Sequence, residues 1–186
     1  MATGTDGRGS DGRPPGGAGA VLDATPDPIE LARRNWVDAG WGDAADGMAL
    51  VTSLVRVHQL VLGRIEELLR PHGLTFARFE VLRLLAFSRA GVLPVGKVGE
   101  RLQVHPASVT NAVQRLEDAG LVERRANPAD GRSVLAAITP AGRRLVESCT
   151  AVLNDEVFAT LPLAPDQAAA ATDALLAVRR SFGDVD

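Results

Sequence analysis

The residues best suited to chemistry in this sequence lie on one short segment with helical periodicity. On a helical wheel of residues 106–118, apolar side chains occupy one face, and small or hydrogen-bonding side chains occupy the other. The second face is formed by Ala107, Ser108, Thr110, Asn111, Gln114 and Arg115. Small side chains let a helix enter a DNA major groove roughly 12 Å wide, where hydroxyl and amide groups can bond to base edges. Pro106 in the first turn leaves the following N–H groups free to face a phosphate. The pattern predicts a helix that reads double-stranded DNA.

Two strand-like segments with arginines follow this helix. Residues 121–126 and 134–139 are separated by the turn-forming run Asn-Pro-Ala-Asp-Gly at 127–131, which predicts a β-hairpin. Its arginines are Arg124 and Arg125 before the tip and Arg132 after it. Asp130 is close enough in sequence to orient the guanidinium of Arg132, and such an arginine can enter a narrow minor groove. The alternative is an ordinary surface hairpin.

Charge is unevenly distributed along the chain. Residues 89–144 include nine basic and five acidic residues, whereas the whole chain has a formal net charge of −3. A basic region in an acidic protein suits local contact with phosphates, although a solvated charged surface would have the same composition.

The composition excludes several other classes of protein. With 46% hydrophobic and 23% charged residues, the chain is an ordinary soluble globular protein, and its single cysteine, Cys149, allows no intrachain disulfide. No apolar run approaches the roughly 20 residues of a membrane span, and residues 1–20 lack the apolar core of a signal peptide. We therefore expect a cytoplasmic protein that does not contact the membrane.

No arrangement of residues predicts catalysis. His58, His72 and His105 lack metal-ligand spacing, and there is no glycine-rich phosphate loop, nucleophile elbow or pair of catalytic carboxylates. We expect neither an enzyme nor a bound metal or cofactor.

Flanking helices must position the DNA-reading unit. The glycine- and proline-rich residues 1–28 predict a disordered tail. Periodicity and breakers then predict an extra helix and linker at 29–45, a long helix at 46–70, a helix capped by Thr75, short helices at 95–102 and 106–119, and long helices from Pro140 to about Leu161 and from Pro165 to Phe182. The fold class is mainly α with a small β-hairpin wing, a winged helix-turn-helix at 75–139. The long helices 46–70 and 140–182 exceed what a DNA-reading unit needs, and dimerisation is their usual role.

The sequence resembles the MarR family of transcriptional regulators over about residues 46–182. The resemblance is carried by residues 98–111, by 115–124, by the Asp-x-Arg wing signature of Asn127–Ser133, and by 135–143. It implies that Ser133 joins the DNA contacts. It also implies a homodimer with interlocked terminal helices, a palindromic operator, and repression relieved by a small anionic or aromatic effector.

The extra helix with Trp36, together with Arg56-Val57-His58, resembles a branch of this family that includes urate-responsive regulators. That branch binds urate through a tryptophan, an acidic residue and an arginine on the DNA-reading helix. The matching positions here are Trp36, Glu80 and Ala112, so the missing arginine implies a different small ligand.

We expect the ligand at the junction of the long helices and the DNA-reading unit, lined by Trp36, His58, Phe79, Glu80 and Arg83. Each residue has an alternative role. Trp36 can anchor the extra helix through apolar packing, and Arg83 can pair with a carboxylate such as Glu80. His58 can be a hydrogen-bonded core residue, whereas the family resemblance places it opposite its own copy across a dimer axis. The alternative for the whole chain is a helical dimeric ligand-binding or protein-docking module that does not bind DNA.

Overall fold

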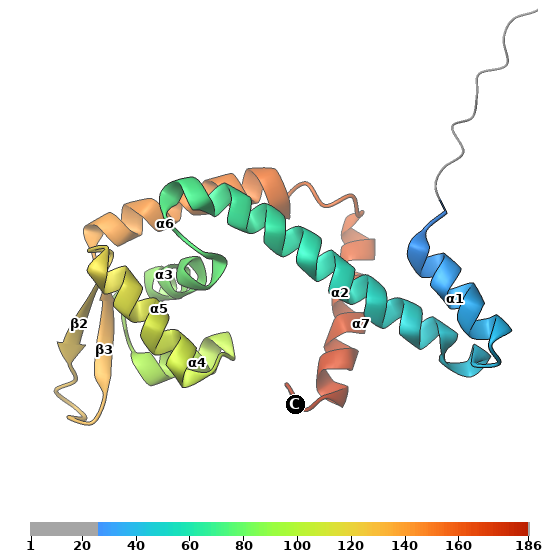
Figure 1. Ribbon diagram of the computed structural model, residues 1–186. Helices are drawn as coiled ribbons and strands as arrows, with labels where there is room; N and C mark the ends of the chain where they lie inside the picture. Colours follow the sequence, from blue (N-terminus) through green and yellow to red (C-terminus); the bar gives the residue numbers. More distant parts are fainter. Residues whose placement is uncertain (1–25, 186) are drawn as a thin grey trace, which may run out of the picture. The chain divides into compact units, whose positions relative to one another are not determined.

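The computed structural model describes residues 26–185, which form seven α-helices and a small sheet. In chain order the elements are α1 (Pro28–Asp38), α2 (Gly42–Leu69), η1 (Arg70–His72), α3 (Phe76–Phe87), β1 (Val92–Pro94), α4 (Val95–Leu102), α5 (Pro106–Asp118), β2 (Val122–Ala126), β3 (Val134–Ile138), α6 (Pro140–Leu153), η2 (Asn154–Phe158) and α7 (Pro165–Ser181) (Figure 1). The chain divides into two compact units, one ending at Leu54 and one beginning at Val55. Most of the predicted disordered tail, residues 1–25, lies outside the described residues.

The first unit contains α1 and the start of α2. Helix α1 begins at Pro28, one residue before the start expected at residue 29, and the Asp27 carboxylate accepts the Ile29 N–H at 3.0 Å and caps the helix. The rings of Trp36 and Trp41 meet edge to face, 5.3 Å between centroids. Helix α2 begins at Gly42, earlier than the predicted residue 46. An acidic residue, Asp43, lies in its first turn, where the helix dipole favours negative charge, and this residue is the sequence signal for the earlier start.

The second unit is built around one apolar core. Its fully buried side chains come from α2 to α6 and from β2 and β3, and they include Leu69, Leu82, Leu85, Val98, Val109, Leu116, Val122, Ala136, Val146 and Leu153. Helix α3 is capped by Thr75, as predicted, and the Glu66 carboxylate of α2 also accepts the Phe76 N–H at 2.8 Å. The start of α3 is thereby attached to the end of α2.

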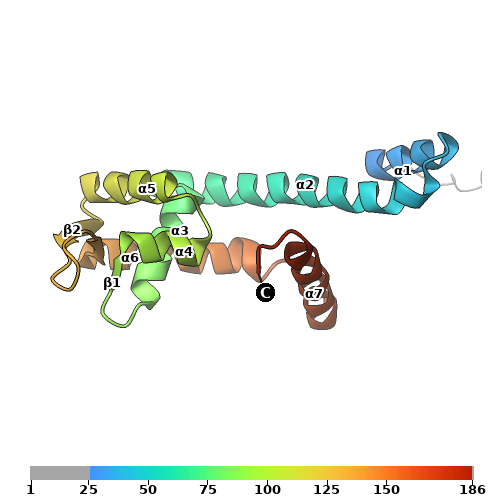
Figure 2. The same cartoon turned by 90° about the horizontal axis from the view of Figure 1, so that it is seen from below.

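The predicted hairpin is present as β2 and β3, and β1 adds a third strand, so the sheet has three antiparallel strands in the order β1-β3-β2. Strand β1 was not predicted, because Gly91 and Pro94 in and beside a segment of only three residues are typical of a chain break. Pairing of Leu93 with Ala136 shows that tertiary contact with β3 creates this strand. Figure 1 shows β2 and β3 projecting beside α5, and the view from below shows the hairpin and α5 at the same end of the unit (Figure 2).

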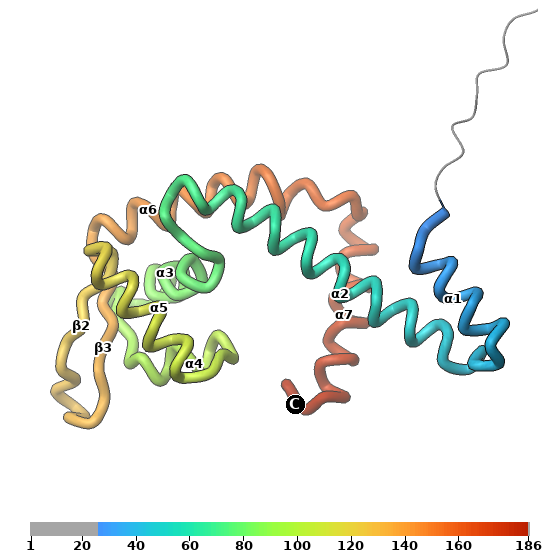
Figure 3. The backbone as a smooth tube through the Cα atoms, in the orientation of Figure 1, coloured from blue at the N-terminus to red at the C-terminus, as the bar shows by residue number. Residues whose placement is uncertain are grey.

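The last helices differ from prediction in their boundaries. Helix α6 ends at Leu153, and a π-helical turn, η2, follows it, so a continuous helix to Leu161 was wrong. The tube in Figure 3 follows this chain into α7, which begins at Pro165 as predicted. Within α6, Cys149 is buried, and burial raises the pKa of its thiol.

Helix α2 leaves an apolar surface exposed in the second unit. Val55, Val57 and Leu60 are each more than half exposed, and His58 beside them is exposed too. The core-histidine alternative for His58 is therefore wrong for the single chain. Contrary to expectation, the helical segment Gly42–His72 is long and apolar enough to cross a membrane by length and composition alone. Helices of soluble proteins pass the same test, so it does not assign this segment to a membrane.

Candidate nucleic-acid interface

Helix α5 presents a polar face outward, as its sequence predicts. Its buried side chains are Val109, Val113 and Leu116. The predicted DNA-reading residues Pro106, Ala107, Ser108, Thr110, Asn111 and Arg115 are exposed, and Gln114 is half-buried. Ser108, Asn111 and Arg115 have no side-chain hydrogen-bond partner within residues 26–185, so these groups are available to a ligand.

The start of α5 and the turn before it are stabilised by one local contact and by contacts with the end of the chain. The His105 side chain is the N-cap, and its Nδ1 accepts the Ala107 N–H at 3.2 Å. Gln103, in the turn before it, has a φ of 54°, a left-handed conformation that disfavours residues other than glycine. Its side chain is bonded to the end of α7: Gln103 Oε1 accepts from the Arg179 guanidinium at 3.1 Å, and Nε2 donates to the Asp184 carbonyl at 2.9 Å. The turn between α4 and α5 is therefore stabilised from outside the helix-turn-helix.

The wing tip is ordered by hydrogen bonds between the turn residues. Asn127 donates to the Ser133 hydroxyl at 2.7 Å, and its own oxygen accepts the Ala129 N–H at 3.1 Å. Asp130 was expected to orient the guanidinium of Arg132, but its carboxylate instead accepts the backbone N–H of Arg132 at 3.0 Å. A short Asp-x-Arg turn brings the carboxylate to the backbone before it can reach a long side chain. Within residues 26–185 the Arg132 guanidinium has no partner.

The tertiary structure places the helix and the wing on one surface. A groove of about 310 Å³ lies between them and is lined by Val95, Gly96, Thr110, Val113, Arg124, Arg132, Ser133 and Val134. The two other wing arginines already have partners. Arg125 pairs with Glu123 at 2.7 Å, and Arg124 bonds to Gln114 at 2.7 Å. Of the predicted wing contacts, Arg132 is the one whose cationic group is unpaired in the described chain.

The residues predicted to line a ligand pocket have separate roles. Phe79 is buried in the core, and burial also raises the pKa of Glu80. Trp36 belongs to the first unit, where its ring contacts Trp41. His58 is exposed on α2.

Arg83 has a carboxylate partner, but it is not Glu80. Its guanidinium bonds to Glu147 at 2.7 Å and to the Thr150 hydroxyl at 3.1 Å, both on α6, and lies 4.3 Å from the centroid of the Phe87 ring. The hydrogen bond from Arg83 lowers the pKa of Glu147. A pairing with Glu80 at a spacing of three residues was plausible from sequence, yet the long-range partner was decided by the packing of α3 against α6.

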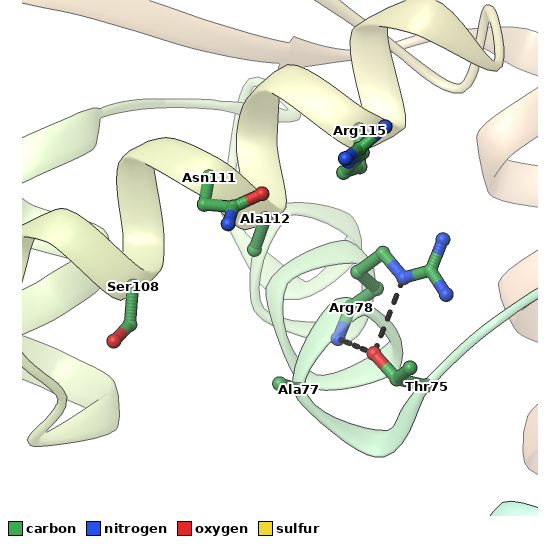
Figure 4. Close-up of a pocket in the computed structure, with 7 residues that line it drawn as sticks. All are labelled: Thr75, Ala77, Arg78, Ser108, Asn111, Ala112 and Arg115. Atoms are coloured by element: carbon green, nitrogen blue, oxygen red, sulfur yellow. Dashed lines mark hydrogen bonds between the residues drawn. The ribbon is translucent and has the colours of Figure 1, made fainter.

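An open cleft of about 560 Å³ lies between the start of α3 and the exposed face of α5. It is lined by Thr75, Ala77, Arg78, Ser108, Asn111, Ala112 and Arg115 (Figure 4). The cleft contains two arginines, Arg78 and Arg115. The Thr75 hydroxyl accepts a hydrogen bond from the Arg78 side chain at 3.2 Å and so holds this arginine in place. Arg78 was not predicted as a site residue, because only its three-residue distance from the capping Thr75 marks it. The cleft combines apolar alanines, two cations and several hydrogen-bonding groups.

Comparison with known proteins decides the family. Residues 72–133 match the model of the MarR family. Sco5413, a MarR family transcriptional regulator from Streptomyces coelicolor with a solved structure, is 44% identical, with a TM-score of 0.68 and coverage of 76% of this chain and 98% of that one. This chain belongs to the MarR family.

Two further relatives of this MarR-family regulator have informative names. The HTH-type transcriptional repressor Rv2887 of Mycobacterium tuberculosis is 34% identical over 110 residues, 59% of this chain and 78% of the relative. The structure of CouR from Rhodococcus jostii bound to p-coumaroyl-CoA is 30% identical, with a TM-score of 0.59 and coverage of 68% and 88%. The predicted family, winged helix-turn-helix fold and class of DNA-binding transcriptional regulator are confirmed. The proposed branch with urate-responsive regulators stays a prediction.

Proposed function

We propose that this MarR-family regulator is a cytoplasmic repressor without enzymatic activity, which binds a palindromic operator as a homodimer and releases it when a small effector binds. The observation that carries the DNA contact is the groove in which Thr110 of α5 and Arg132 of the wing lie together. The exposed Ser108, Asn111 and Arg115 of the same helix have no side-chain partner among the described residues. Two such surfaces related by a two-fold axis match two half-sites about 10 bp apart, centre to centre. Nuclease footprinting on its own promoter fragment tests this arrangement, and protection of a single half-site would contradict it.

The interface divides into base contacts and phosphate contacts, and two variants separate them. Asn111→Ala is expected to weaken operator binding by about 1–3 kcal/mol and to leave binding to random DNA nearly unchanged, because an amide can discriminate base edges. Arg132→Ala is expected to weaken binding to both DNAs and to reduce the salt slope by about one, because a phosphate contact is lost. Electrophoretic shifts with both DNAs over a salt series measure these effects. Equal losses on both DNAs for both variants would contradict the assignment.

The homodimer is supported by apolar surface that the single chain leaves exposed. On α2 this surface includes Val57 and Leu60, and the segment from η2 to α7 adds Phe158, Leu161 and Leu163. Large exposed apolar patches are unusual on soluble monomers and mark interaction sites. A second copy provides the same patch under two-fold symmetry, so both can be buried together.

For the effector we propose the cleft between α3 and α5 in place of the pocket expected from sequence. Phe79 is buried in the core and Arg83 is paired with Glu147, so neither side chain is free for a ligand. The open cleft, in contrast, contains two cations, Arg78 and Arg115. An aromatic ring with an anionic group would satisfy such a lining, and CouR, which binds p-coumaroyl-CoA, supports this class of ligand. Because Asn111 and Arg115 line both the cleft and the DNA-facing surface, a bound effector would compete directly with DNA.

Arg78→Gln tests the cleft without changing a predicted DNA contact. In the parent protein, an aromatic carboxylate or p-coumaroyl-CoA that binds should raise the melting temperature and release the operator. The variant is expected to lose at least about 1 kcal/mol of ligand affinity, the net value of a charge-assisted hydrogen bond, with nearly unchanged DNA affinity. Thermal shift and competition assays measure both quantities. An unchanged ligand response in Arg78→Gln would place the effector elsewhere.

A further inference from the structure

A second set of contacts joins α5 to the wing without involving DNA. The Gln114 Oε1 atom accepts a hydrogen bond from the Arg124 guanidinium at 2.7 Å. The Glu117 Oε1 atom accepts the backbone N–H of Arg124 at 3.2 Å, and Glu117 Oε2 lies 4.0 Å from the guanidinium. We call these residues, Gln114, Glu117 and Arg124, the wing brace. They connect the last turns of the helix to strand β2 through both its backbone and a side chain.

The hydrogen-bonding capacity of Gln114 is largely used within the chain. Its carbonyl oxygen faces Arg124, and its amide nitrogen donates to Asp118 at 2.9 Å and to Glu117 at 3.4 Å. A glutamine that reads adenine needs both its oxygen and its nitrogen for the base. Gln114 would have to break charge-assisted bonds to do so, and these are stronger than neutral ones. Asn111, one turn earlier, has no such partners.

Arg124 also differs from Arg132 in having a hydrogen-bond partner within the chain. Side chains of the wing brace shield one another, leaving about a third of Arg124 (34%) and of Glu117 (35%) exposed. Both arginines line the groove between wing and helix, but within the described chain only Arg132 of the two has no partner. Two arginines of one hairpin are therefore in different states: one is bonded to the protein, and one is free for a phosphate.

We propose that Gln114, Glu117 and Arg124 are positioning residues that set the angle between α5 and the wing, and that none of them contacts DNA through its side chain. This inference rests on the proposed DNA binding and revises the roles that the sequence suggested for Gln114 and Arg124. Base reading is then limited to Ala107, Ser108, Thr110, Asn111 and Arg115 of α5. The wing brace contributes by keeping helix and wing in the relative position that lets both reach the same DNA.

Salt dependence separates positioning from contact. Arg124→Ala is expected to weaken binding to operator and to random DNA by the same factor, about tenfold, with an unchanged salt slope. Arg132→Ala is the matched variant on the wing, and its slope should fall by about one. Gln114→Ala is likewise expected to affect both DNAs equally, in contrast to Asn111→Ala on the same helix. A lower salt slope in Arg124→Ala, or a loss confined to the operator in Gln114→Ala, would overturn the proposal.

Glu117 provides a test that a simple charge effect cannot mimic. Glu117→Gln keeps an oxygen that can accept the Arg124 N–H, whereas Glu117→Ala removes it. The wing brace predicts that the Ala variant binds both DNAs about tenfold more weakly and that the Gln variant retains most of the affinity. Repulsion between Glu117 and phosphates would instead make both variants bind more tightly, which would refute the proposal. Hydrogen exchange at the Arg124 amide should be faster in the Ala variant only.

The parent protein distinguishes failure of this inference from failure of the proposed function. If the parent does not shift its promoter fragment, the proposed function fails. If the parent binds and the Glu117 and Arg124 variants bind as tightly as the parent does, the wing brace alone is refuted. None of these residues belongs to the buried core, and unfolding midpoints close to that of the parent confirm that each variant is folded.

Discussion

Val57→Glu is expected to convert the homodimer into monomers and to weaken operator binding by about 100-fold or more. Val57 is 56% exposed on α2, within the apolar surface that we assign to the partner. Because of the two-fold symmetry, the dimer would bury two new carboxylates without partners. Burial costs several kcal/mol for each charge, and this cost exceeds the usual effect of an interface substitution. Sedimentation or light scattering at micromolar protein, together with electrophoretic shifts, measures both changes.

Gln59→Glu is the matched control for this variant. It introduces the same charge two residues later, about 160° around the helix from Val57, on the side that carries Thr52, Val55 and Arg56. We expect it to stay dimeric and to bind DNA like the parent. A Val57→Glu protein that sediments as a dimer would show that α2 does not form the interface.

Gly142→Ala is expected to destabilise the fold by about 3 kcal/mol and to lower the melting temperature by roughly 6–12 °C. Gly142 is buried in the first turn of α6, and a Cβ atom there would collide with the carbonyl oxygen of Leu121. That oxygen also accepts the Thr139 N–H at 3.0 Å, so moving it would disturb the junction between the sheet and α6. The backbone cannot move aside as a flexible side chain can. The loss of folding free energy therefore lies at the upper end of the range that is usual for overpacking. Thermal and denaturant unfolding measure it.

Gly96→Ala is the matched control for this second prediction. Gly96 also lies in the first turn of a helix, α4, and a Cβ atom there would meet nothing within 4 Å. The substitution should be neutral or stabilising by up to about 1 kcal/mol, since it reduces the entropy of the unfolded chain. Equal melting temperatures for the two alanine variants would show that residue 142 is not packed as described.

The amino-acid sequence by itself determined most of the secondary structure and the polar face of α5. Periodicity located α5 and its polar side, and Thr75 and Pro165 marked the starts of α3 and α7 as observed. These features depend on local signals, namely helical repeats, caps and turn residues, which act over a few neighbouring positions. The same signals failed for β1, whose three residues become a strand only through pairing with β3.

The tertiary structure alone decided which side chains are free and which are engaged. Arg83 could have paired with a ligand or with Glu80, and the packing of α3 against α6 gave it Glu147 instead. Arg124 and Arg132 look equivalent in sequence, yet only Arg124 reaches α5, because its place on β2 brings it beside Gln114. Arg78 entered the cleft in the same way, through the approach of α3 to α5. The pairing of Arg83 with Glu147 joins residues 64 positions apart, and no local pattern encodes it.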